Sequence, residues 1–239
     1  MASVKNVRIK SEKTVVQKGE DSMELRQPEQ VSNYDKVIEE WRLRFQQMNQ
    51  EEIIGKFHLK SDENALYLPY FSHEMRIDRL TGKISYLKEP KREAGFNTCM
   101  DIYNLFYYSI EIPVASGRLV PFREVKRVYP FEAAYKRTVL KTLQETFSGH
   151  VEELKKACEK LGGKPLPQGD AGYQLSVYPF LDIAIYFWDA DDEFEAQANI
   201  LFDSNITDFL HEENVVLVAS DAVSYLTEAA GLYTGSGKK

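Results

Sequence analysis

Apolar side chains recur every three or four residues along several segments, the spacing of a helix with one buried face. Residues 34–50 show it in Val37, Trp41, Phe45 and Met48. Asn33 is the expected N-cap of this helix, because an Asn side chain can accept a hydrogen bond from the first turn. Helical spacing also predicts helices at residues 98–109, 131–147, 151–161 and 212–230, and Pro121 predicts a short helix at 121–127.

Short runs rich in β-branched and aromatic residues predict strands. They lie at residues 53–59, 65–71, 73–80, 83–87, 172–178, 182–189 and 196–202. Thr81–Gly82 predicts a tight turn that pairs residues 73–80 with 83–87 in a hairpin.

Strands and helices fall into separate groups along the chain instead of alternating. This order predicts an α+β fold, with mostly antiparallel sheets built from hairpins and packed against several helices. The 239 residues suffice for a sizeable core. We expect one α+β domain at residues 32–232, a flexible polar lead at 1–31 and a disordered tail at 233–239.

Composition narrows the class of protein. The formal net charge of −7 argues against general binding to nucleic acid, whose phosphates would repel the chain. The two cysteines, Cys99 and Cys158, form no CxxC motif, so an iron–sulfur cluster or a Cys-rich zinc site is not expected. No secretory signal and no apolar run of about 20 residues is present, so we expect a cytoplasmic protein with free thiols and no membrane partner.

The densest group of charges lies between two apolar runs, at Asp189, Asp191, Asp192, Glu193 and Glu195. A hard cation such as Ca²⁺ or Mg²⁺ binds several carboxylate oxygens at once. The proposed ligands are Asp191, Asp192, Glu193 and Asp203, provided that the fold places Asp203 near the loop. The alternative is a solvated hairpin tip that keeps a sheet edge soluble.

Five further residues are candidates for binding a small molecule. Arg123 shares the predicted short helix with Lys126 and Arg127, and a basic face of this kind suits a phosphate or a carboxylate. The structural alternative for Arg123 is a solvated or salt-bridged face, and each of the other four also has one, in the core, at the surface or as a cap. They are Tyr103, Tyr107, Trp188 and His211.

Motifs of several enzyme classes are missing from the chain. It has no GxGxxG or GxxxxGK[ST] sequence for nucleotides and no GxSxG sequence of a serine hydrolase. The residues alone do not distinguish an enzyme from a binding protein, and they leave the oligomeric state open.

A series of short motifs follows in the C-terminal third of the chain. They are LGG at 161–163, Gly169–Asp170, a strand around Pro179, Trp188 with Asp191–Phe194, and LFD at 201–203. This order resembles the uncharacterised domain-of-unknown-function family 3786, with its W-x-x-DDEF and LFD signature. Because YNLFYY and PFREVKR are similar to the family's middle region, the resemblance covers residues 50–227.

The resemblance implies an origin in anaerobic metabolism. Some relatives carry an added Cys-rich cluster domain and accompany corrinoid and one-carbon proteins, but this chain lacks those cysteines. The leading hypothesis is a protein that binds a small-molecule ligand or cofactor, either tetrapyrrole-like or otherwise anionic. The alternatives are a metal-dependent enzyme that uses a divalent cation at the acidic loop 189–203, and a protein-interaction module.

Overall fold

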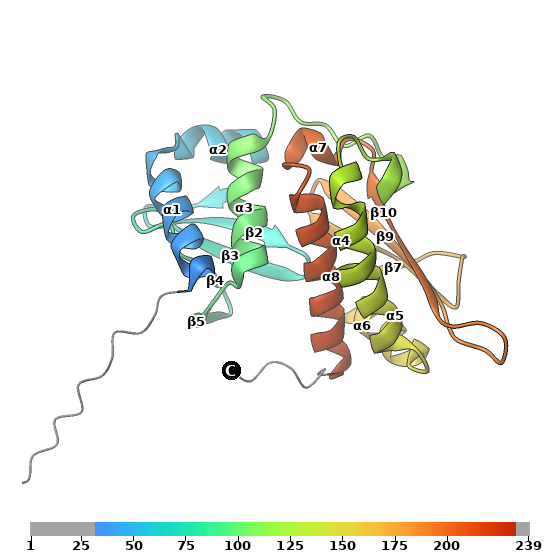
Figure 1. The fold of residues 1–239 in the computed structure, drawn as a ribbon. Coiled ribbons are helices and arrows are strands. Elements are labelled where there is room, and N and C mark those ends of the chain that lie inside the picture. The colour runs from blue at the N-terminus through green and yellow to red at the C-terminus, as the bar shows by residue number, and fades with distance from the viewer. Residues whose placement is uncertain (1–31, 233–239) are drawn as a thin grey trace, which may run out of the picture. The chain divides into compact units, whose positions relative to one another are not determined.

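A computed structural model describes residues 32–232, and it confirms the α+β prediction with two antiparallel sheets and the helices packed on them (Figure 1). The predicted lead and tail, residues 1–31 and 233–239, lie outside the described residues. Sheet A has the strand order β1-β2-β3-β4-β5, so each strand pairs with its neighbour in the chain. Its strands are β1 (Lys60–Ser61), β2 (Ala65–Tyr70), β3 (His73–Asp78), β4 (Ile84–Tyr86) and β5 (Glu89–Glu93).

Sheet B has the order β6-β10-β9-β8-β7. The strands are β6 (Leu119–Pro121), β7 (Lys164–Pro165), β8 (Ala171–Tyr178), β9 (Leu181–Trp188) and β10 (Gln197–Asp203). The three long strands are those predicted from the apolar runs. Short β6 crosses from the middle of the chain to pair with β10, and this distant pairing had no local signal.

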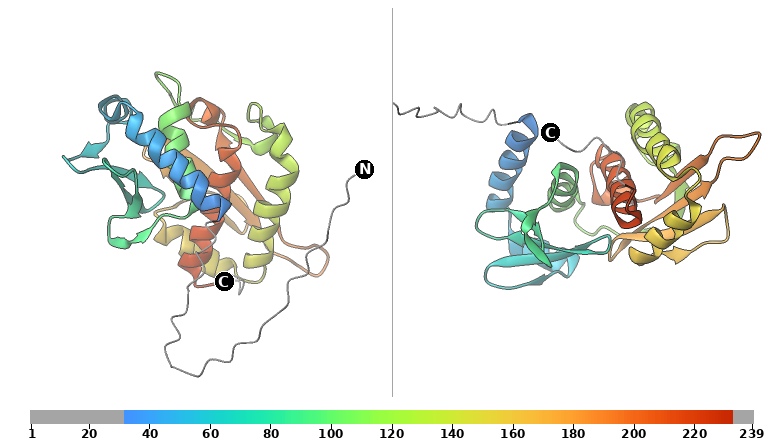
Figure 2. Two further views of the ribbon diagram at one scale, coloured as in Figure 1. Left: turned by 60° about the vertical axis from the view of Figure 1, so that its left-hand side comes forward. Right: turned by 90° about the horizontal axis from the view of Figure 1, so that it is seen from below.

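The longer helices are α1 (Asn33–Gln47), α2 (Gln50–Phe57), α3 (Phe96–Tyr108), α6 (Val151–Lys160) and α8 (Asn214–Ala230). Short ones are α4 (Glu132–Tyr135), α5 (Lys141–Phe147) and α7 (Ile206–Phe209). Three further helical turns are η1 (Phe122–Glu124), η2 (Tyr129–Phe131) and η3 (Lys136–Leu140). Helices α3 and α8 lie side by side, α3 on sheet A and α8 on sheet B (Figures 1 and 2).

One buried apolar cluster runs through both sheets and the helices between them. Leu68 and Ile77 contribute to it from sheet A, and Ile185 and Phe202 contribute from sheet B. A backbone hydrogen bond of 2.8 Å from Phe71 N to Val177 O joins the β2–β3 turn to β8. The junction between α3 and α8 is therefore interior to the molecule rather than a surface groove.

The strand prediction at residues 53–59 was wrong, because these residues belong mostly to α2. Ile53 and Phe57 are buried four positions apart, which is helical spacing. Asn49 accepts a hydrogen bond from Glu52 N at 3.3 Å and so caps the helix. The apolar run was short enough to fit either structure, and the cap decided between them.

The first helix is confirmed, but its N-cap is Ser32 rather than Asn33. The Ser32 hydroxyl accepts from Asp35 N, and the Asp35 carboxylate accepts from Ser32 N in return. This reciprocal pair satisfies two backbone amides and makes Ser32 the stronger cap.

The short helix predicted at residues 121–127 is reduced to the single turn η1. Val125 is extended, and Arg127 has a φ of 63° in the left-handed region. Arg123, Lys126 and Arg127 consequently do not share a helix face. The basic face predicted from their spacing is not formed.

Residues 131–147 are helical, but the helix is not uniform. It passes from α4 through the π-helical turn η3 into α5. Strand β5, with the sequence EPKRE, was also missed, because charged residues and Pro are depleted in strands. Within residues 32–232, no helix is both long and apolar enough to cross a membrane.

Candidate functional site

The proposed metal ligands do not converge. Asp203 ends β10 on the side away from the loop, and the seven residues of this strand span roughly 20 Å. Its carboxylate is 2% exposed and accepts hydrogen bonds from Ser116 N, Gly117 N and Asn205 N at 3.0, 2.8 and 2.8 Å. Asp203 therefore caps the turn into α7 and fastens the loop before β6.

The carboxylates of the acidic loop face water. Asp191 Oδ1 accepts from Glu193 N and Phe194 N at 2.8 and 2.7 Å, and these bonds lower the pKa of Asp191. Asp192 and Glu193 are exposed. No group of three or more His, Cys, Asp or Glu side chains in residues 32–232 is placed to hold a metal ion. This part of the chain gives no support to a metal-dependent enzyme.

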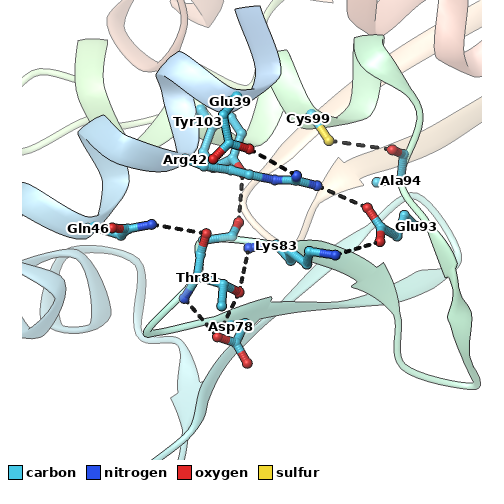
Figure 3. Close-up of polar contacts among 11 residues, drawn as sticks. Glu39, Arg42, Gln46, Asp78, Thr81, Lys83, Glu93, Ala94, Cys99 and Tyr103 are labelled. Carbon is cyan, nitrogen blue, oxygen red and sulfur yellow. Dashed lines mark hydrogen bonds and ion pairs between the residues drawn. The ribbon is translucent and has the colours of Figure 1, made fainter. Parts of the chain in front are cut away.

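Tyr103 is buried where α1 meets the β3–β4 turn (Figure 3). Its hydroxyl donates to Gly82 O at 2.6 Å. Arg42 on α1 pairs with Glu39 and Glu93 at 3.2 and 2.9 Å in the same contact. The Tyr103 bond thus joins α3 to the β3–β4 turn, and the Arg42–Glu93 pair joins α1 to β5.

The other four candidate ligand residues are at least partly accessible, but only two of them lie near each other. Tyr107 is exposed at the end of α3, and its ring meets that of Tyr108 at 4.9 Å. Tyr108 in turn lies 5.1 Å from the ring of His211, whose Nδ1 accepts from Glu213 N at 3.3 Å. Arg123 on η1 and Trp188 at the end of β9 are on other elements.

The most unusual polar group was not predicted from the sequence. Asp101 on α3 and Asp221 on α8 are both buried. The hydroxyl of Tyr70, on β2, lies 2.7 Å from Asp101 Oδ2 and 3.1 Å from Asp221 Oδ2. Two carboxylates and one phenol thus meet where α3, α8 and sheet A come together.

Neutral donors complete the surroundings of this pair. Asn214 Nδ2 donates to Asp101 Oδ1 at 2.8 Å, and Thr98 Oγ1 donates to Asp221 Oδ2 at 2.6 Å. The Thr98 hydroxyl also lies 3.1 Å from the hydroxyl of Tyr225, which lies 3.0 Å from that of Tyr86. None of the ion pairs of the described residues involves Asp101 or Asp221.

Burial shifts both carboxyl groups toward the protonated form. It holds the pKa of Asp101 well above its ordinary value, and the charge of Asp221 adds to this rise. Burial raises the pKa of Asp221 to about 6, although hydrogen bonds from Thr98 and Tyr70 act against it. Burial is the largest cause of the rise in both pKa values, and Asp101 is completely buried.

Aromatic rings connect this pair to a pocket. Tyr178 lies 5.3 Å from the ring of Tyr70 and stacks on Phe180 at 5.5 Å. The Tyr178 hydroxyl is buried without a hydrogen-bond partner among the described residues, and burial and the charges of Asp101 and Asp221 raise its pKa. Phe180 forms part of the pocket wall, so the rings of Phe180, Tyr178 and Tyr70 lie in sequence between the pocket and the carboxylates.

The pocket has a volume of about 330 Å³ and an aromatic wall. Phe180 stacks on Phe57 at 5.3 Å and on Phe209 at 5.4 Å. Ile112, which is 76% exposed, lies in the segment between α3 and β6 and forms another side. Charged or titratable side chains and one proline complete the lining: Lys56, His58, Glu111 and Pro113. An apolar floor with a few polar groups is typical of small-molecule sites.

Two local signals could have revealed the buried pair. Asp101 interrupts the apolar helix sequence TCMDIYNLFYY, and Asp221 interrupts VVLVASDAVSYL. A carboxylate at a core position of a helix must find hydrogen bonds or a proton there. The sequence therefore indicates that Asp101 and Asp221 are carboxylates at core positions, but it does not indicate that they meet.

Comparison with known proteins identifies a family for the chain. No significant match was found among curated proteins or among solved structures. The family model described as Domain of unknown function (DUF3786) matches residues 49–225, which include the pocket, the buried pair and the acidic loop but not α1. The match spans well over half of the chain, and the chain belongs to the DUF3786 family.

Proposed function

We propose that the protein binds a small, flat, largely apolar molecule with an anionic group in the pocket at Phe57, Phe180 and Phe209. The observation that carries this proposal is the group of three stacked rings in the pocket wall, in which Phe180 is partly accessible while Phe57 and Phe209 are 7% and 1% exposed. The accessible part of Phe180 and the side chain of Ile112 offer apolar surface to a planar ligand. The ammonium of Lys56 lines the pocket 6.0 Å from the Phe57 ring. It donates to Ser109 O and Oγ at 3.5 and 3.4 Å but pairs with no carboxylate of the described residues, so its charge can pair with an anion.

Size and charge restrict the ligand further. A volume of about 330 Å³ is near the lower end of the range of roughly 300–1,000 Å³ for ligand pockets. This volume favours a ligand of one or two fused rings over a tetrapyrrole; in either case the proposed ligand is planar and carries an anionic group. Glu111 also lines the pocket and would repel a carboxylate, so the anionic group should lie on the Lys56 side. A role of this ligand in anaerobic metabolism rests on the family resemblance.

Thermal unfolding with added ligands tests the proposal. Small aromatic carboxylates, their neutral amides, haem and cobalamin are titrated separately, since a ligand of the folded state raises Tm by mass action. We expect Lys56→Gln to weaken carboxylate binding about tenfold and to leave amide binding unchanged. The matched control is Lys91→Gln, at an exposed lysine of β5 outside the pocket. The proposal fails if no compound raises Tm, or if both variants bind like the wild type.

A second candidate function is docking of a basic protein partner at the acidic loop. The observation in its favour is Phe194, which is 68% exposed among the carboxylates and held by Asp191. An exposed aromatic side chain with acidic neighbours suits a partner that offers an apolar hollow rimmed by Lys or Arg. Binding should then weaken with added salt and be lost in Phe194→Ser. Capture of the same partner by Phe194→Ser would contradict this function.

A further inference from the structure

We propose that Asp101 and Asp221 share one bound proton at neutral pH, and that this proton holds α8 against α3 and β2. The inference is independent of the ligand-binding proposal. The hydrogen atoms of the group are too few for its contacts when both carboxyl groups are ionised. The Tyr70 hydroxyl carries one hydrogen, yet its oxygen lies within hydrogen-bond distance of Asp101 Oδ2 and Asp221 Oδ2. With both carboxylates ionised, one of the two O···O contacts has no hydrogen between its oxygens.

A single proton on the pair resolves the deficit. When it resides on Asp101, the acid donates to Tyr70, and Tyr70 donates to Asp221. Asn214 still donates to the other oxygen of Asp101, and Thr98 still donates to Asp221. Each close contact in the row from Asp101 to Thr98 then contains one hydrogen.

No cation replaces the proton in this part of the chain. The side chains in hydrogen-bond contact with the pair are neutral: Tyr70 from β2, Thr98 from α3 and Asn214 from α8. Beside them, Tyr178 faces the pair from β8, and its unpartnered hydroxyl is a further neutral donor. A second negative charge would therefore have to be buried without a counter-ion, which is strongly unfavourable.

Among the described residues, the charged groups nearest to the hydroxyl row lie at its outer end. The thiol of Cys99 on α3 stays neutral, because burial and the charge of Asp221 raise its pKa to about 12. The row runs from Thr98 through Tyr225 to Tyr86. The half-buried ring of His73 lies 4.7 Å from that of Tyr225, and Arg92 lies 4.4 Å from the centroid of Tyr86. Glu228 pairs with Arg92 at 2.8 Å, which neutralises that cation. The row of hydroxyls thus runs from the buried pair toward this surface group, whose His73 and Arg92 contact the rings of Tyr225 and Tyr86.

The proton has a mechanical role because the bonds of the pair cross between elements. Asp101 and Thr98 belong to α3, Asp221 and Asn214 belong to α8, and Tyr70 belongs to β2. Loss of the proton places two like charges around one phenol oxygen. Repulsion then acts directly across the α3–α8 contact.

Hydrogen exchange of the α3 and α8 amides tests this role. Above pH 6, where Asp221 is ionised, opening releases the shared proton, so the opening constant of wild type, corrected for the chemical exchange rate at each pH, should rise about tenfold per pH unit while the closed state still holds that proton. Asp101→Asn should remove this dependence, since its amide donates to Tyr70 and accepts from Asn214 as the protonated acid does. Asp192→Asn makes the same chemical change in the acidic loop and should behave like wild type.

Equal pH dependence in wild type and Asp101→Asn would overturn the proposal. A second measurement covers the case in which Asp101→Asn does not fold. Infrared spectra of wild type at neutral pH should contain the carbonyl band of a buried protonated carboxyl group, with a shift in D₂O. Absence of that band would also overturn it.

Discussion

The acidic loop at residues 189–195 and the buried pair of Asp101 and Asp221 are both groups of carboxylates, but they differ in what surrounds the charge. In the loop, water and backbone amides compensate the carboxylates, and the pKa of Asp191 is lowered. The carboxylates of the pair are buried and form no ion pair with a cation among the described residues, and the pKa values of both are raised. Density of charge along the sequence is thus a poor guide to electrostatic cost. Burial decides that cost.

The largest expected contrast is in the pH dependence of stability. A carboxyl group with a raised folded-state pKa stabilises the fold fully below its unfolded pKa, near 4, and loses this contribution as the pH rises through the folded value. For Asp221, with a pKa of about 6, the loss is about 3 kcal/mol between pH 4 and pH 7. The free energy of unfolding of wild type relative to Asp221→Asn, measured in urea, should fall by this amount. A constant difference would contradict the assignment.

Removal of the bridging hydroxyl should have the next largest effect. Tyr70→Phe keeps the ring packed against Tyr178 and Tyr225 but removes the hydroxyl, which among residues 32–232 is the one group hydrogen-bonded to both carboxylates. We expect a loss of about 2 kcal/mol in the free energy of unfolding at pH 7, because a buried carboxylate loses its donor. The matched control is Tyr67→Phe, whose hydroxyl donates to exposed Asp62. An equal effect of the two variants would remove the distinction between buried and exposed carboxylates.

The loop offers a smaller and more local effect. Asp191→Ala removes the acceptor of the Glu193 and Phe194 amides. Amide exchange at these two positions should become faster, while protection of the α3 and α8 amides stays unchanged. Asp191 changes the pH dependence of stability in the opposite direction to the pair. Because its pKa is lowered in the fold, it stabilises the folded state at a pH above its unfolded pKa, and this stabilisation is lost as the pH falls. A general rise of exchange across α3 and α8 would show that the loop is coupled to the pair.

The smallest effect is expected for Asp192. Its side chain is exposed, and it makes none of the hydrogen bonds or ion pairs described for the loop. Asp192→Asn should leave Tm and its dependence on pH within error of wild type. A clear change in calorimetry with Ca²⁺, Mg²⁺ or Mn²⁺ that this variant abolishes would revive the divalent cation that the loop was predicted to bind.

Much of the fold followed from local patterns. Residues 151–161 and 212–230 were predicted as helices from spacing, and the structure has α6 and α8 there. The hairpin of β3 and β4 followed from its turn residues. Residues 53–59 were mispredicted, because a short apolar run suits a strand or a helix equally until the cap at Asn49 is considered. The two phenylalanines near the acidic loop differ in a way that the sequence pattern does not distinguish: Phe194 is 68% exposed, whereas Phe202 is buried.

The candidate sites were less predictable than the fold. The five predicted ligand residues do not form one site, since two lie on α3 and the other three on other parts of the fold, and Asp203 is separated from the loop by the length of β10. The pocket wall combines residues of α2, the β8–β9 turn and α7, which lie far apart in the chain. Side chains that meet across such distances leave no periodic pattern in one sequence.

The sequence by itself determined the α+β class, most of the helices and hairpins, and the family resemblance, because each depends on neighbours a few positions apart. It also held Asp101 and Asp221 as carboxylates within apolar helices. Only the tertiary structure decided that Tyr70, 31 positions before Asp101 and 151 before Asp221, stands between them. The physical reason is that burial and contact depend on how α3, α8 and sheet A pack, and those two properties set the charge state of the pair.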